Sequence, residues 1–176
     1  MKEEKLWNSN YIKVWLANFM IFFSFMLVTP LLPIYLSETF AADKHVIGVV
    51  LSGYTLTALL VRPFSGFIVD SYPRKQVLLI CFFLMFIFFA GYLVAGSLLL
   101  FAIVRTLHGA PFGATTVANS TVAIDVLHPS RRAEGIGYYG ISNNLGMALG
   151  PTISFATYNL FKSYDALFIC AFVACA

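Results

Sequence analysis

The sequence contains little charge for its length. Of its 176 residues, 11% are Asp, Glu, Lys or Arg, whereas 60% are hydrophobic. Soluble domains are usually about half apolar and about a quarter charged. This depletion of charge argues against an ordinary soluble domain and predicts that most of the chain lies in lipid.

Cysteine is also scarce, and the sequence patterns of common enzymes are missing. Cys81, Cys170 and Cys175 lie in apolar runs without CxxC or Cys/His spacing, so we interpret them as free thiols and expect no metal site. The sequence has no phosphate-binding glycine loop, no nucleophile elbow and no HExxH motif. We therefore expect neither an enzyme nor a resident cofactor, and nothing supports nucleic-acid binding.

Long apolar runs predict a bundle of membrane-spanning helices, because a helix needs about 20 mostly apolar residues to cross a bilayer. Lys2 and Lys5 precede the first run as in a signal peptide, but this run is too long and lacks a cleavage site, so we interpret it as a retained span. The predicted helices cover about 12–36, 46–69, 77–95, 98–127, 135–161 and 166–176.

The run at 166–176 is shorter than a span requires. We therefore expect five complete membrane helices and the start of a sixth, all within one domain at 1–176. A half-inserted helix at the end of a natural chain is unusual. The sequence is accordingly interpreted as a piece of a longer protein.

Basic residues are distributed unevenly between the predicted loops. The loops opposite the N-terminus hold only Lys44 and Lys162. By the positive-inside rule, the N-terminus and the loops at 70–76 and 128–134 are predicted to lie in the cytoplasm. The basic residues on the predicted cytoplasmic side are Lys2, Lys5, Lys13, Arg74, Lys75, Arg131 and Arg132.

Two arginines lie within predicted helices, where a charge must be paired, face a cavity or extend to the surface. Arg62 is close enough to the surface for its side chain to extend to it. Alternatively, Asp70 is its partner, since Arg62, Gly66 and Asp70 follow one another at four-residue spacing on one helix face. Arg105 lies deeper and has His108 on the same helix face. We expect Arg105 to face a cavity. His108 is either a hydrogen-bonded interior residue or a proton carrier.

Other polar residues within the predicted spans either line a polar route or form hydrogen bonds between helices. These residues are Asn18, Ser24, Thr29, Tyr54, Thr115, Thr116, Asn119, Asn143 and Asn144.

Small residues recur at four-residue spacing in two predicted helices. Gly109 and Gly113 flank Pro111, and Pro151 lies beside a second stripe. Such stripes let helix backbones approach closely, and prolines mark points where a helix can bend. We predict tight seams on which helices pack or slide. The second stripe consists of Ser142, Gly146, Gly150 and Ser154.

A short charged turn separates the predicted helices at 46–69 and 77–95. It contains Asp70, Arg74 and Lys75, and Asp125 ends the helix at 98–127 near the same membrane face. Asp70, Arg74 and Asp125 would form an acid–base–acid cluster that latches three helices together. Alternatively, they are solvated surface charges that contribute little to stability.

Three motifs resemble those of the major facilitator superfamily, in the family's order. Residues 66–75, GFIVDSYPRK, are similar to the pattern Gly-x-Leu-x-Asp-Arg-x-Gly-Arg-Lys between helices 2 and 3, with departures at Ile68, Ser71 and Pro73. Residues 105–113, RTLHGAPFG, resemble the family's helix 4 motif. Residues 146–151, GMALGP, resemble the helix 5 motif typical of antiporter branches.

This resemblance implies an all-α membrane transporter of two six-helix halves that works by alternating access, with this chain as most of the N-terminal half. It implies export of a small organic molecule, drug-like or sugar-like, from the plasma (inner) membrane. The proton gradient would supply the energy, and the missing C-terminal half would be the partner. A non-transporting membrane sensor or assembly protein that retains the fold is the alternative.

The resemblance also implies roles for individual residues. In the family, the residues matching Asp70, Arg74 and Asp125 stabilise the outward-open state, and the arginine matching Arg105 takes part in proton coupling. Many drug exporters carry an acid in helix 1, but the predicted helix at 12–36 has Asn18, Ser24 and Thr29 as its polar residues. We therefore expect the protonatable acid in the missing half.

Overall fold

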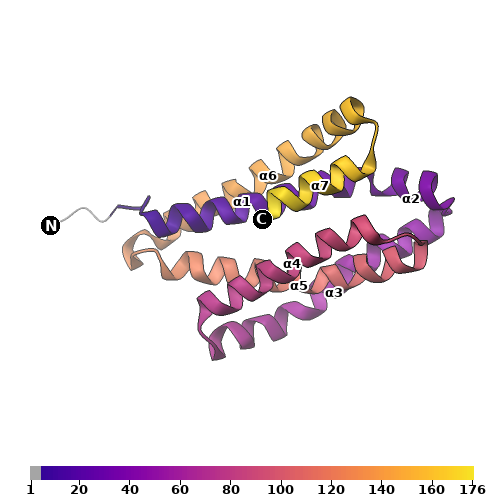
Figure 1. The fold of residues 1–176 in the computed structure, drawn as a ribbon. Coiled ribbons are helices and arrows are strands. Elements are labelled where there is room, and N and C mark those ends of the chain that lie inside the picture. Colours follow the sequence, from indigo (N-terminus) through magenta and orange to yellow (C-terminus); the bar gives the residue numbers. More distant parts are fainter. Residues whose placement is uncertain (1–4) are drawn as a thin grey trace.

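The computed structural model describes residues 5–176, and the regular structure of this part of the chain is entirely helical (Figure 1). The elements are α1 (Ser9–Val28), η1 (Thr29–Leu31), α2 (Leu32–Phe40), α3 (Lys44–Ser71), α4 (Arg74–Val94), α5 (Leu98–Asp125), η2 (Pro129–Arg131), α6 (Arg132–Phe161) and α7 (Tyr164–Cys175).

Polar capping residues explain why several helices begin before their apolar runs. The Asp43 carboxylate accepts a hydrogen bond from the backbone N–H of Val46 at 2.8 Å, and the Ser163 hydroxyl accepts one from Ala166 at 3.4 Å. Such caps satisfy N–H groups that have no partner within the helix. As a result α3 and α7 each begin two residues before the predicted boundaries at 46 and 166.

The first span is longer than the helix predicted over 12–36. It extends from Ser9 to Phe40 and is interrupted by the 3-10 turn Thr29–Leu31. Pro30 and Pro33 have no backbone N–H to donate, so two hydrogen bonds of the α-helical ladder are missing within four residues, which favours an irregular turn here. The interruption matters for the site below, because it places the Thr29 side chain at the interior of the bundle.

The helices form two groups of three (Figure 1). In one group α1 packs along α6 and α7. In the other, α5 lies between α3 and α4, which touch each other only slightly. The two groups meet where α4 packs on α7 and where α5 packs on α1 and α6.

Glycines on α5 explain its close contact with α3. A methyl group at Gly109 would overlap the carbonyl oxygen of Tyr54, and one at Gly113 would overlap that of Ala58. Pro111 is buried between the two glycines and lies within the helix. The predicted packing stripe on this helix therefore lies at an interhelical contact, which only glycine can occupy without displacing the α3 backbone.

The stripe on α6 lies against α1 in the same way. A methyl group added at Gly146 would overlap Phe19, Phe22 and Phe23 of α1. One added at Gly150 would overlap Met26 of the same helix. Ser142 and Ser154 on the same face are fully buried, whereas Pro151 is partly exposed. Two further bonds join these helices, from Tyr11 Oη to the Gly135 carbonyl at 2.5 Å and from Trp15 Nε1 to the Tyr138 carbonyl at 2.8 Å.

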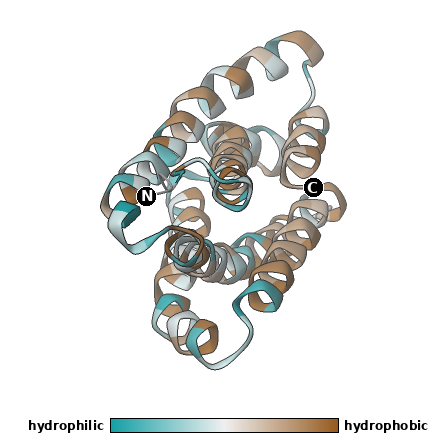
Figure 2. Ribbon diagram, turned by 90° about the vertical axis from the view of Figure 1, so that its left-hand side faces the viewer, coloured by the Kyte–Doolittle hydropathy of each residue, from teal (hydrophilic) through white to brown (hydrophobic). Residues whose placement is uncertain are grey.

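Four helical segments are long and apolar enough to cross a membrane, at 9–40, 44–71, 74–94 and 98–125. Hydrophobic residues cover most of the ribbon, and hydrophilic ones gather at the turns nearest the viewer in Figure 2. Helix α6 has 30 residues but carries the small and polar stripe described above, and α7 has 12 residues. The prediction of an all-α integral membrane bundle is confirmed.

The N-terminus, the α3–α4 turn and the α5–α6 connection lie at one end of the molecule (Figure 1). Most basic residues of the described chain gather there, whereas Lys44 and Lys162 lie at the other end. Lys2, which was counted in the predicted charge asymmetry, lies outside the described residues. The basic residues at the first end are Lys5, Lys13, Arg74, Lys75, Arg131 and Arg132.

Candidate functional site

The Arg105 side chain is almost completely enclosed, with an exposed fraction of 2%. Its Nη1 donates a hydrogen bond to the Tyr92 hydroxyl at 3.0 Å, and its Nη2 donates to Thr29 Oγ1 at 3.3 Å. The guanidinium carbon lies 4.1 Å from the centre of the Tyr54 ring. Across residues 5–176, no carboxylate lies within ion-pair distance of Arg105. Hydroxyl groups and an aromatic face therefore stabilise this charge.

His108 continues the hydrogen-bonded chain one turn further along α5. Its Nδ1 lies 2.6 Å from the Tyr92 hydroxyl oxygen, which already accepts from Arg105. A guanidinium can only donate, so the Tyr92 hydrogen is not used by Arg105 and can point to His108 Nδ1. The His108 ring is stacked on Phe88 at 5.7 Å and meets the edge of Phe89 at 4.7 Å.

Thr29, Tyr54, Tyr92, Arg105 and His108 form what we call the Arg105 cluster. Three buried polar atoms of this cluster lack a hydrogen-bond partner within the described chain: Tyr54 Oη, Arg105 Nε and His108 Nε2. Buried polar groups are nearly always paired, with protein or with water. The cluster therefore retains unused hydrogen-bonding capacity beside an uncompensated positive charge.

A separate polar pocket lies between α1, α3, α5 and α6, with a cavity volume of about 290 Å³. Its lining mixes amides, hydroxyls and a guanidinium with two apolar side chains, so it offers mainly hydrogen-bonding groups. The lining residues are Asn18, Phe22, Arg62, Thr116, Val117, Ser120, Tyr139 and Asn143.

Asn18 organises the inner wall of this polar pocket. Its side-chain nitrogen donates to Ser142 Oγ at 2.7 Å and contacts the Asn143 side-chain oxygen. Its oxygen accepts from the Tyr139 hydroxyl at 2.7 Å, and that hydroxyl accepts from Asn119 at 3.0 Å. These bonds link α1, α5 and α6 and hold the pocket-facing groups in fixed positions.

The structure separates candidates that the sequence analysis had grouped together. Asn18, Asn143 and Arg62 lie at the polar pocket, and Arg62 is exposed there. Tyr54, Arg105 and His108 instead belong to the Arg105 cluster, so Arg105 does not face an open cavity as predicted. The reason is that the interrupted first span and α4 close over this face of α5. Asn144 is exposed and is not among the described residues that line the polar pocket.

The charged turn brings together the three predicted residues of the acid–base–acid cluster. The Arg74 guanidinium contacts the Asp125 carboxylate directly, and its Nη2 lies 3.6 Å from Asp70 Oδ1. These contacts join α3, α4 and α5 at one membrane face. A methyl group added at Gly66 would meet no atom within 4 Å, and Lys75 is exposed without an ion pair in the described part of the chain.

Sequence reasoning missed Tyr92 of the Arg105 cluster and four residues that line the polar pocket, Phe22, Val117, Ser120 and Tyr139. Tyr92 lies in α4, whose nearly uniform apolar composition shows no polar face. Tyr139 lies next to Tyr138 in α6, and nothing in the sequence distinguishes the buried hydroxyl from the exposed ring. Only the four-residue spacing from Tyr139 to Asn143 places the two residues on one helix face.

Comparison with known proteins agrees with this architecture. Residues 14–176 match the profile of the family described as the Major Facilitator Superfamily. The quinolone resistance protein NorA of Staphylococcus aureus (strain MRSA252) is 24% identical over 146 residues, which are 83% of this chain and 37% of the relative. The uncharacterized MFS-type transporter YqjV of Bacillus subtilis (strain 168) is 26% identical over 124 residues, 70% of this chain and 30% of the relative.

The chain thus spans about a third of the length of these two relatives. The family match, by contrast, covers nearly the whole chain and includes the charged turn, the Arg105 cluster and the polar pocket. The chain belongs to the Major Facilitator Superfamily.

Proposed function

We propose that this chain is the N-terminal part of a secondary active transporter that exports a small organic molecule in exchange for protons. The buried Arg105, which has no carboxylate partner within residues 5–176, carries this proposal. An arginine at membrane depth is retained where it serves a function. A cation with spare donors can bind an anionic group that comes and goes during a transport cycle.

Proton exchange supplies such a group. A carboxylate from a C-terminal half would be attracted to Arg105 when ionised and released when protonated. The cluster itself offers no carboxyl group, which agrees with a protonatable acid lying elsewhere in the full protein. The Tyr92–His108 hydrogen bond keeps the guanidinium in place during this exchange.

The polar pocket supports a separate role in substrate binding. Its amide and hydroxyl groups come from helices of both three-helix groups, α1 and α6 of one and α5 of the other. We propose that it forms one wall of the substrate site and that a second six-helix half forms the other. The relative NorA is named for quinolone resistance, so a quinolone is the first substrate to test.

The charged turn supports a latch between conformational states. Arg74 joins acids at the ends of α3 and α5 while all three side chains stay partly exposed, so the contacts can form and break at low cost. The excess of basic residues at this end supports a cytoplasmic N-terminus in the plasma membrane.

Transport by the full-length protein tests the proposal. In inside-out vesicles with an acidic interior, a fluorescent quinolone should accumulate as protons leave. A protonophore should abolish this accumulation, and Arg105→Ala should do the same at equal protein level. Accumulation that persists without a pH gradient would exclude proton exchange, and a chain that binds but never transports would favour the sensor or assembly alternative.

A further inference from the structure

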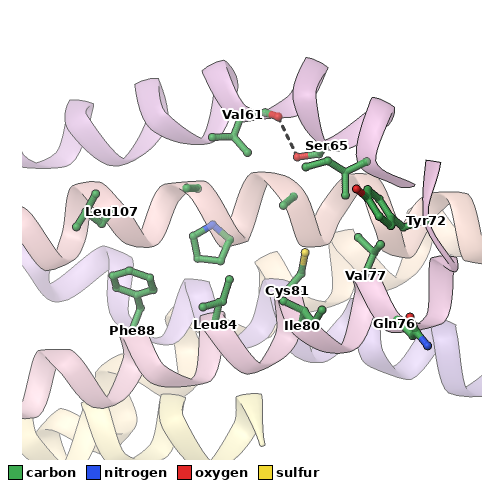
Figure 3. Close-up of a pocket in the computed structure, with 14 residues that line it drawn as sticks. Val61, Ser65, Tyr72, Gln76, Val77, Ile80, Cys81, Leu84, Phe88 and Leu107 are labelled. Atoms are coloured by element: carbon green, nitrogen blue, oxygen red, sulfur yellow. Dashed lines mark hydrogen bonds between the residues drawn. The ribbon is translucent and has the colours of Figure 1, made fainter. Parts of the chain in front are cut away.

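A second, larger cavity lies on a different face of α5 from the polar pocket. It is a groove of about 550 Å³ between α3 and α4, which touch each other little and both pack on α5 (Figure 3). The small side chains of Ala110 and Ala114 form its floor and leave the space between the two helices unfilled. We call this feature the α3–α4 groove.

The lining of the α3–α4 groove is almost entirely apolar. Val61 of α3 faces Ile80 and Leu84 of α4 across the floor (Figure 3), and Ile68 also lines the groove. The one hydroxyl on the α3 side, Ser65, donates to the Val61 carbonyl at 2.9 Å and so offers no free donor. A polar substrate would lose its hydrogen bonds to water here, whereas a hydrocarbon chain would lose none.

The length of the groove matches one leaflet of a bilayer. Along α4 it extends from Gln76 to Phe88, which at about 1.5 Å per residue corresponds to about 18 Å. Half of a hydrocarbon core is about 15 Å thick. The groove begins at the charged turn and ends at Phe88, six residues before the end of α4, so it has room for most of an acyl chain of that leaflet.

Charge at the mouth of the groove suits an anionic head group. Tyr72 and Gln76 line the mouth, and Lys75 is exposed beside them. Arg74 is engaged by Asp125 and Asp70, but no acid of the described chain pairs with Lys75. A lysine next to the membrane surface attracts anionic lipid.

We propose that the α3–α4 groove binds one acyl chain of an anionic phospholipid, with the phosphate beside Lys75. The inner end of the groove is Phe88, whose ring is stacked on His108 at an interplanar angle of 10°. A bound chain therefore contacts the side chain that encloses the Arg105 cluster. This lipid site is distinct from the polar pocket and does not depend on the identity of the transported molecule.

Photolabelling tests the site directly. The full-length protein in detergent is mixed with phosphatidylglycerol that carries a diazirine at the end of one acyl chain, irradiated and digested, and adducts are located by mass spectrometry. Adducts should concentrate on the inner groove, at Leu84, Phe88 and Leu107. Ala114→Phe should lower this labelling about tenfold, because the ring displaces roughly two methylene groups of the chain.

Matched controls make the result decisive. Ala156→Phe, at an exposed alanine on α6 outside the groove, should leave labelling unchanged. If Ala114→Phe does not fold, Ala110→Leu fills the groove with a smaller side chain and should also lower labelling. Lys75→Gln should weaken labelling by phosphatidylglycerol but not by a phosphatidylcholine analogue. Labelling spread evenly over exposed α4 side chains such as Leu79 and Phe83, or labelling unaffected by both filling variants, would overturn the proposal. So would crosslinks showing another protein segment seated in the groove.

Discussion

The Tyr92 hydroxyl oxygen accepts a hydrogen bond from Arg105 Nη1 at 3.0 Å. This bond connects α4 to α5 at the centre of the bundle, and the same oxygen lies 2.6 Å from His108 Nδ1. A single phenol therefore bonds both to a buried cation and to a buried imidazole. Both contacts are lost when this one oxygen is removed.

Tyr92→Phe should accordingly destabilise the protein. The substitution keeps the ring but leaves Arg105 Nη1 and His108 Nδ1 without partners, and a buried unsatisfied group costs about 1–3 kcal/mol. Thermal unfolding in detergent measures the change. Tyr138→Phe, at an exposed ring in α6, is the matched control and should unfold like the wild type. Equal unfolding of the two variants would show that the Tyr92 hydroxyl bonds do not stabilise the fold.

The two acids beside Arg74 should differ in importance. Asp125 contacts the guanidinium directly, whereas Asp70 lies 3.6 Å away and its side chain is 72% exposed. Exposed and loosely placed partners contribute less and are screened by salt. Asp125→Asn should therefore change the rate of transport cycling more than Asp70→Asn does.

Turnover in proteoliposomes at low and high ionic strength measures this difference. The effect of Asp125→Asn should shrink as salt rises, because salt already weakens the pair in the wild type. If Asp70→Asn proves the more damaging substitution, the geometry of the acid–base–acid cluster is not what sets the cycling rate. In that case Asp70 acts in another conformation.

Two glycines of α6 should respond oppositely to the same substitution. Gly150 packs against Met26 of α1, where a methyl group has no space, and overpacking costs about 1–3 kcal/mol. Gly140 has nothing within 4 Å of the position of an added methyl. Alanine is a better helix former than glycine by about 1 kcal/mol, so Gly140→Ala should be neutral or stabilising.

Unfolding of Gly150→Ala and Gly140→Ala in the same detergent measures both effects. The predicted order of stability is Gly140→Ala at or above the wild type and Gly150→Ala below it. The reverse order, or no difference, would contradict the close α1–α6 seam.

Features encoded in local sequence were predictable. Apolar runs and polar caps are properties of short segments, so the helices could be placed to within a few residues. The acid–base–acid cluster was also within reach, because Asp70 and Arg74 are four residues apart and the topology brings Asp125 to the same face. Hydropathy alone does not show the interruption of the first span, since Thr29–Leu31 lies within a long apolar run, but Pro30 and Pro33 mark this place as one where the helix can bend or loosen.

The partners of Arg105 could not be predicted in the same way. They come from the first span, α3 and α4, and each contact depends on how those helices are rotated about their axes. In α4, apolar residues surround Tyr92 on every side, so hydropathy defines no inward face. The expectation of a cavity-facing Arg105 failed for this reason, because the closure of α4 and the first span over α5 is a property of packing.

We propose that the buried Arg105, which has no carboxylate partner within residues 5–176, couples proton movement to substrate movement. The most direct test uses full-length protein in proteoliposomes that enclose a pH indicator. Addition of a quinolone outside should draw protons out of the lumen in exchange, so the indicator should report alkalinisation. Arg132→Ala, at an exposed arginine of the same charge, is the control and should behave like the wild type.

Arg105→Ala should abolish this substrate-driven alkalinisation. Arg105→Lys should retain part of it, because an ammonium keeps the charge but cannot reproduce the fixed fork that reaches Tyr92 and Thr29 together. A folded Arg105→Ala protein that moves protons in response to substrate at the wild-type rate would show that Arg105 does not couple the two movements.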